Sequence, residues 1–152
     1  PHFFIVYGTK SPDGLKTFRQ TEYDALREHA KNRANALERK REQRLNTVDM
    51  FAGHQAEVQE TTIDQIVVEQ KAQASARLVE ALTKHGALKF PTILTGLLQA
   101  YMLRETNVKD ICVDLFRAGT IENTWGGGSR KPNDATLIKL TAKPTSNTKQ
   151  SD

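Results

Sequence analysis

Residues Asn107 to Leu140 read NVKDICVDLFRAGTIENTWGGGSRKPNDATLIKL, a sequence typical of a helix followed by two strands around a flexible loop. Apolar residues in its first part recur at the i, i+3, i+4 and i+7 spacing of a helix that buries one side. They are Val108, Ile111, Cys112 and Leu115. Thr106 or Asn107 is a suitable cap for the start of this helix. Gly119 is the residue type that most easily adopts the left-handed conformation at a helix end, so we expect the helix to stop there.

Two short strands are predicted after this helix, at Thr120–Glu122 and Thr136–Leu140. Between them lies a segment that is rich in glycine and carries the adjacent cations Arg130 and Lys131; we call residues 125–134 the basic loop. Glycine at this density does not favour regular structure, so the strands should form a hairpin around the loop. A helix that leads into such a hairpin is how a winged helix ends.

The residues before this stretch supply the other parts of a winged helix. Thr62 can cap a helix that ends at His85-Gly86, and Leu88–Phe90 can form a short strand. Pro91 suits the start of the next helix. The sequence therefore predicts a winged helix-turn-helix domain over residues 62–142, with a small antiparallel sheet in a mainly α fold. The polar residues 143–152 are expected to form a disordered tail.

The first part of the chain predicts a different unit. His2–Tyr7 is aromatic and β-branched, as in a buried strand, and no glycine or proline interrupts Leu15–Leu45, which predicts a long helix. We interpret residues 1–45 as the end of an α/β domain and residues 46–61 as a linker or short helix. Because the first residue is Pro1 and the next ones already resemble a buried strand, we expect a longer protein with a preceding domain.

Composition limits the classes of protein that fit. No apolar run approaches the roughly 20 residues that span a bilayer, so we expect no membrane partner. Cys112 is the only cysteine, which excludes an internal disulfide and agrees with a cytoplasmic location. The net charge of +4 permits a polyanionic partner without requiring one.

No catalytic or cofactor site is visible in the sequence. The four histidines share no metal-ligand spacing with each other or with Cys112, so no metal is expected. Cys112 lies on the apolar side of its helix, where a small buried side chain is the simpler interpretation. Gly126–Ser129 matches neither a P-loop nor a dinucleotide fingerprint. Any enzymatic activity would belong to a domain upstream, and no cofactor is assigned to this chain.

The basic loop is the predicted binding site, for DNA or RNA. Cations on a loop can follow a phosphate backbone, whereas the carboxylates Asp110 and Asp114 disfavour base reading by the helix. The candidate residues are Arg130, Lys131, Ser129, Trp125, Lys109 and Arg117. Arg130 and Lys131 would contact phosphate, with Ser129 and Lys109 in support and Trp125 positioning the loop. The alternative is that Trp125 packs under the hairpin and that the cations are only solvated.

Two further interpretations stay open. The stretch Arg39–Arg44 is strongly cationic and is either a solvated helix face or a phosphate-binding patch. A protein-interaction function is the main alternative to nucleic-acid binding, with the long helix and the winged helix binding a partner subunit or forming a homodimer.

Two segments resemble the three-Cys-motif partner family. The start, His2–Lys16, is similar to a late strand of that family that runs into a Thr-x-x-Pro-x-Gly-Leu type turn and a helix. Leu88–Leu140, with Ala118-Gly119-Thr120-Ile121 and the basic loop, is similar to its C-terminal winged helix-turn-helix domain. The resemblance implies a Rossmann-like, methyltransferase-related domain upstream and a partner with a three-cysteine signature. This chain departs from the family pattern at Thr17–Tyr23, where family members often have a helix that contains a Trp.

Overall fold

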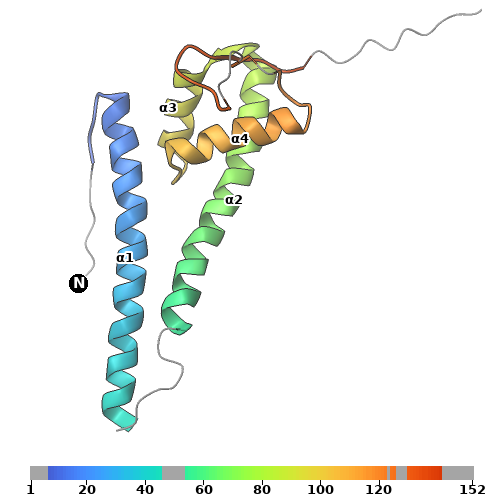
Figure 1. The fold of residues 1–152 in the computed structure, drawn as a ribbon. Helices are drawn as coiled ribbons and strands as arrows, with labels where there is room; N and C mark the ends of the chain where they lie inside the picture. Colours follow the sequence, from blue (N-terminus) through green and yellow to red (C-terminus); the bar gives the residue numbers. More distant parts are fainter. Residues whose placement is uncertain (1–6, 46–53, 123, 126–129, 142–152) are drawn as a thin grey trace, which may run out of the picture.

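The computed structural model describes residues 7–45, 54–122, 124–125 and 130–141, with side chains from residue 63 onward in the second helix. Within these residues the chain is mainly helical with a small antiparallel sheet, as predicted (Figure 1). The elements in order are α1 (Pro12–Leu45), α2 (His54–His85), β1 (Leu88–Lys89), α3 (Phe90–Ala100), α4 (Glu105–Arg117) and β2 (Leu137–Ile138). Across the described residues no helix combines the length and apolar character of a membrane span.

The two long helices α1 and α2 run antiparallel as a pair (Figure 1). Small buried side chains, at Ala30 and Ala34 of α1 and Ala74 of α2, let helix backbones approach closely. The shorter elements α3, α4, β1 and β2 gather at the end of α2 that lies beside the start of α1. The far end of the helix pair extends away from this globular head.

One hydrophobic core holds the head together and includes a residue of α1. Leu78 of α2, Phe90 of α3, Val108 of α4 and Ile138 of β2 are each at most 2% exposed. Tyr23 of α1 is 7% exposed and belongs to the same cluster. Helix α1 therefore has a packing partner within this chain, and the assignment of residues 1–45 to a preceding domain stays a prediction.

The sheet forms where the sequence predicts strands, although the strands are shorter. β1 and β2 are antiparallel, with Leu88 opposite Ile138 and Lys89 opposite Leu137. Ile121 forms an isolated antiparallel bridge with Leu140. The segments on the two sides of the basic loop therefore pair with each other.

Both ends of α4 follow from local chemistry. The helix begins at Glu105, earlier than the predicted cap at Thr106 or Asn107. The Asn107 side chain instead reaches back, and its Oδ1 accepts the backbone N–H of Arg104 at 2.9 Å. Gly119 ends the helix with φ +71°, as predicted. Its N–H donates to the Phe116 carbonyl at 2.8 Å, the inner bond of the Schellman arrangement.

The main difference from the sequence prediction is the start of α2. Residues 54–61, predicted to be a linker or short helix, belong to α2, which begins at His54 and not at Thr62. Gly53 is the last glycine before a long run of helix formers, but the first turns lack an apolar stripe, so periodicity did not detect them. The predicted strand at residues 2–6 and the tail at 143–152 lie outside the described residues.

Candidate functional site

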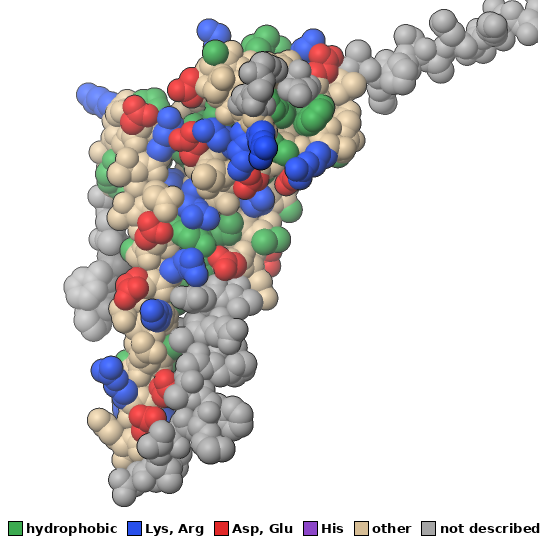
Figure 2. Space-filling model, in the orientation of Figure 1, with side chains coloured by type: hydrophobic (Ala, Val, Ile, Leu, Met, Phe, Trp, Pro, Cys, Tyr) green, Lys and Arg blue, Asp and Glu red, His purple; other side chains and the backbone are tan. Residues whose placement is uncertain are grey.

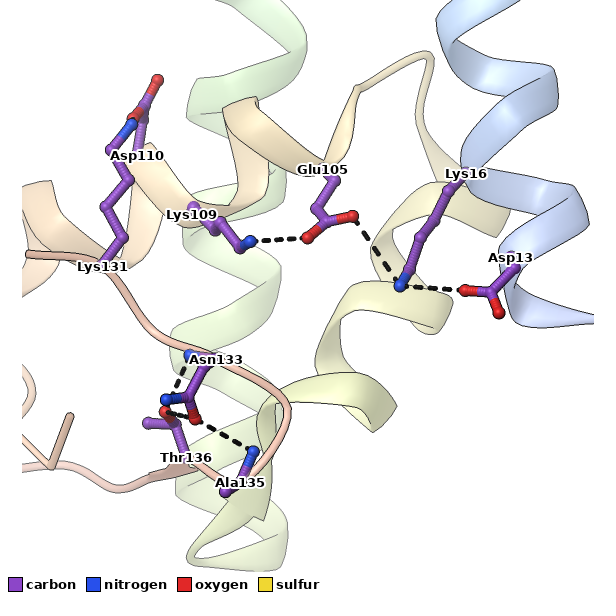
Figure 3. Close-up of polar contacts among 9 residues, drawn as sticks. All are labelled: Asp13, Lys16, Glu105, Lys109, Asp110, Lys131, Asn133, Ala135 and Thr136. Atoms are coloured by element: carbon purple, nitrogen blue, oxygen red, sulfur yellow. Dashed lines mark hydrogen bonds and ion pairs between the residues drawn. The ribbon is translucent and has the colours of Figure 1, made fainter. Parts of the chain in front are cut away.

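The second half of the basic loop is fixed by a tight turn (Figure 3). The Asn133 side chain accepts the N–H of Ala135 at 3.0 Å, and the Thr136 hydroxyl accepts the N–H of Asn133 at 2.9 Å. The carbonyl of Thr136 in turn accepts the N–H of Phe90 at 2.9 Å. Because Phe90 is fully buried at the start of α3, these bonds join the loop to the core of the head.

An ion pair attaches the loop to α4. Lys131 Nζ lies 2.6 Å from Asp110 Oδ1, and the two side chains are 49% and 40% exposed (Figure 3). Arg130, the next residue back along the loop, is exposed. No carboxylate in the described part of the chain pairs with Arg130. The loop therefore lies beside α4 with its arginine open to a ligand.

Trp125 lies beneath the hairpin. The indole is 4% exposed, and its ring meets Phe116 of α4 edge-on, with centroids 5.7 Å apart and planes at 80°. A buried ring cannot stack on a nucleotide base. Packing under the hairpin, the alternative kept open for this residue, is what the structure shows, and this packing can still position the loop.

A row of ion pairs links α1 to the start of α4 (Figure 3). Lys109 Nζ lies 2.6 Å from Glu105 Oε1, and the other oxygen of Glu105 lies 3.7 Å from Lys16 Nζ. Lys16 also pairs with Asp13 at 3.2 Å. The hydrogen bond to Asp13 is the largest cause that raises the pKa of Lys16, against the opposing effect of burial. These ion pairs connect α1 to the start of α4 and leave Lys109 near the loop.

The predicted site residues are therefore only partly brought together. Arg130, Lys131 and Lys109 lie on the loop and the neighbouring part of α4, whereas Arg117 is eight residues further along the helix, about 12 Å away. Arg117 lies 3.8 Å from Asp114. Ser129 lies outside the described residues. Figure 2 shows the same mixture of charges more widely, with Lys and Arg interspersed among Asp and Glu over the face that it presents.

Sequence reasoning missed two contributors to this site. It treated Asp110 only as a charge that repels phosphate, but the structure uses this carboxylate to hold Lys131. It also overlooked the turn made by Asn133 and Thr136. An Asn three residues before a Thr, directly after a proline, is a turn signal that could have been recognised.

Nucleophilic and metal chemistry have little support in the described residues. Cys112 is fully buried, and burial raises the pKa of its thiol to about 12. No group of three His, Cys, Asp or Glu side chains in this part of the chain could hold a metal ion. The site offers charge and shape, which are the properties of a binding surface.

Comparison with protein-family models, curated proteins and solved structures finds no match to this chain. The resemblance to the three-Cys-motif partner family consequently stays a prediction.

Proposed function

We propose that this chain is a nucleic-acid-binding module with a winged-helix arrangement, in which the basic loop and α4 face a phosphate backbone. One observation carries the proposal. The strand segments on the two sides of the loop pair through Ile121 and Leu140, and the Lys131–Asp110 ion pair places the loop beside α4 with Arg130 exposed. A hairpin that presents cations next to a surface helix can contact two parts of one duplex.

The ion pairs of the site are compatible with phosphate binding. Lys131 and Asp110 are each about half exposed, and exposed pairs of this kind contribute only about 0–1 kcal/mol. A phosphate can therefore compete for Lys131 at little cost. Asp110 and Asp114 would repel phosphates if α4 entered a groove deeply, so we propose contact through the backbone and not through base edges.

The same proposal sets the role of this region in a larger protein. As an accessory region of a methyltransferase-like protein, it would bring a nucleic acid to an upstream domain without supplying catalysis itself. The resemblance of His2–Lys16 and Leu88–Leu140 to the three-Cys-motif partner family supports this view. DNA and RNA both present the phosphate backbone that the loop would contact.

The test is binding to a fluorescent 20-base-pair duplex DNA at several salt concentrations. Replacing Arg130 and Lys131 together by Ala removes two cations, and each phosphate contact contributes about 0.9 to the slope of log K against log salt. We expect weaker binding at low salt and a slope that is smaller by about 1.8. The same titration with duplex RNA shows which nucleic acid is preferred.

A matched control makes the same change of charge elsewhere. Arg77 and Lys84 are exposed cations of α2, and they line a hollow to which neither the basic loop nor α4 contributes a residue. The variant with both replaced by Ala should keep the affinity and slope of the unmodified chain. If the two double variants lose affinity equally, only net charge matters and the loop is not the contact surface; an unchanged slope in the loop variant also rejects the proposal.

A further inference from the structure

A hollow of about 480 Å³ lies between α2 and α3, which are neighbours in the head (Figure 1). Its walls include Leu78 of α2 with Ile93 and Leu97 of α3, which are at most 5% exposed and belong to the hydrophobic core. None of its lining residues belongs to α1, to α4 or to the basic loop. We call this space the α2–α3 hollow, and it shares no residue with the candidate nucleic-acid site.

The hollow exists because small residues lie where larger side chains would fill it. Gly96 is exposed on α3, and a Cβ built there would meet no atom within 4 Å. Ala81 of α2 and Ala100 of α3 also line the space. The lining runs from Thr92 to Ala100, which is about 12 Å along α3. The hollow is therefore an elongated recess whose apolar walls can be covered by a slender ligand.

A cation lines the same hollow. Arg77 of α2 is exposed, and in the described part of the chain no carboxylate lies within ion-pair distance of it. A smaller hollow of about 140 Å³ shares Arg77 and Ala81 with the first and is also lined by Glu80, Lys84 and His85. Two permanent cations here face one carboxylate. The recess thus combines apolar walls with a positively charged side.

We propose that the α2–α3 hollow binds a small amphipathic anion, namely a carboxylate at the end of an unbranched acyl chain. The chain lies against Leu78, Ile93 and Leu97, and the carboxylate pairs with Arg77. Sites for small molecules have volumes of about 300–1,000 Å³, with mostly apolar walls and a few polar groups that fix orientation. The guanidinium of arginine matches a carboxylate through two parallel hydrogen bonds. The proposal does not depend on nucleic-acid binding.

Other occupants match the hollow less completely. A phosphate backbone would pair with Arg77 but would leave the apolar walls of the recess uncovered. A helix of a partner protein is about 10–12 Å across with its side chains, so it would cross a recess of this length with few contacts. Stable protein interfaces bury more than about 1,000 Å², which the recess does not offer. A neutral apolar molecule would leave Arg77 without a partner.

The test is isothermal titration calorimetry of the full chain with octanoate, decanoate and dodecanoate. Affinity should rise with chain length, by at most about fourfold for each methylene group that is buried. The Arg77→Gln variant should bind decanoate about fivefold more weakly, as expected for the loss of an exposed ion pair. It should bind 1-decanol as the unmodified chain does, because the alcohol carries no charge.

Gly96→Leu tests the walls, because its side chain occupies the hollow. It should weaken decanoate and 1-decanol at least tenfold, whereas Gly96→Ala, the matched control, adds one methyl group and should keep most of the affinity. Circular dichroism checks that both variants keep their helix content. Gly96→Leu should also bind duplex DNA as the unmodified chain does, which separates this proposal from the function proposed for the basic loop.

Several results would overturn the proposal. They are the absence of binding for all three carboxylates, an affinity that does not depend on chain length, and equal effects of Gly96→Leu and Gly96→Ala. An Arg77→Gln variant that loses decanoate and 1-decanol equally would also overturn it. Binding to phosphatidylglycerol vesicles without binding to the free carboxylates would reject it as well and would assign the hollow to a membrane surface.

Discussion

Cys112 shows how a residue's surroundings decide its chemistry. Its side chain is fully buried on the inner side of α4, and burial raises the pKa of the thiol to about 12 from its ordinary value of 9.0. The thiolate is the reactive form, and at pH 8 almost none is present. We expect a thiol reagent such as DTNB to label the folded chain slowly and the chain in denaturant rapidly.

The control for this experiment moves the thiol to the surface. Thr106 is exposed at the start of α4. The Thr106→Cys variant in a Cys112→Ser background should therefore react with DTNB as fast as an ordinary free thiol. Rapid labelling of Cys112 in the folded protein would show that the thiol is accessible, and would contradict the packing described for α4.

For single residues, the sequence predicted whether a side chain is cationic or buried better than it predicted which other side chain it contacts. The cations of the basic loop and the burial of Cys112 could be recognised from local patterns. The packing of Trp125 could not be recognised in this way, because it depends on contact with Phe116, which lies nine positions earlier on α4. The Lys131–Asp110 pair joins residues 21 positions apart, and no local pattern predicts such a contact.

At the scale of the element, two glycines should respond to alanine in opposite directions. Gly119 has φ +71°, a conformation that alanine adopts at a cost of about 1 kcal/mol. Gly96 lies inside α3, and a Cβ there would meet nothing within 4 Å. Alanine favours the helix over glycine by about 0.5–1 kcal/mol. Urea unfolding should therefore show that Gly119→Ala lowers and Gly96→Ala raises the free energy of unfolding.

Each variant serves as the other's control, since the chemical change is the same. Two destabilised variants would mean that α3 packs more tightly around Gly96 than described. Two stabilised variants would mean that α4 does not end in a left-handed residue at Gly119.

Helices were predictable to the extent that they bury one side. The apolar spacing of α3 and α4 located both of them, and Gly119 ended α4 as expected. The first turns of α2 were missed because they are polar. The two-residue strands carry little signal of their own, and their pairing follows from the order of the elements and not from strand propensity.

At the scale of the whole molecule the position of α1 was the least predictable feature. Its contacts with the head are specific but distant in sequence. Arg19 Nε donates to the Leu98 carbonyl at 2.8 Å, and the Arg104 guanidinium lies 3.9 Å from the centroid of the Tyr23 ring. The Tyr23 hydroxyl donates to Asp64 at 2.8 Å. The sequence showed a long helix with a thin apolar side, but not which surface that side would cover.

Backbone amide NMR of the full chain, titrated with a 16-base-pair duplex, locates the contact surface residue by residue. If the basic loop and α4 bind the phosphate backbone, chemical-shift changes concentrate in α4 and in residues 130–139, and they shrink as salt is raised. Changes confined to α1 and α2, or none in the presence of excess duplex at low salt, would contradict binding through the loop and α4.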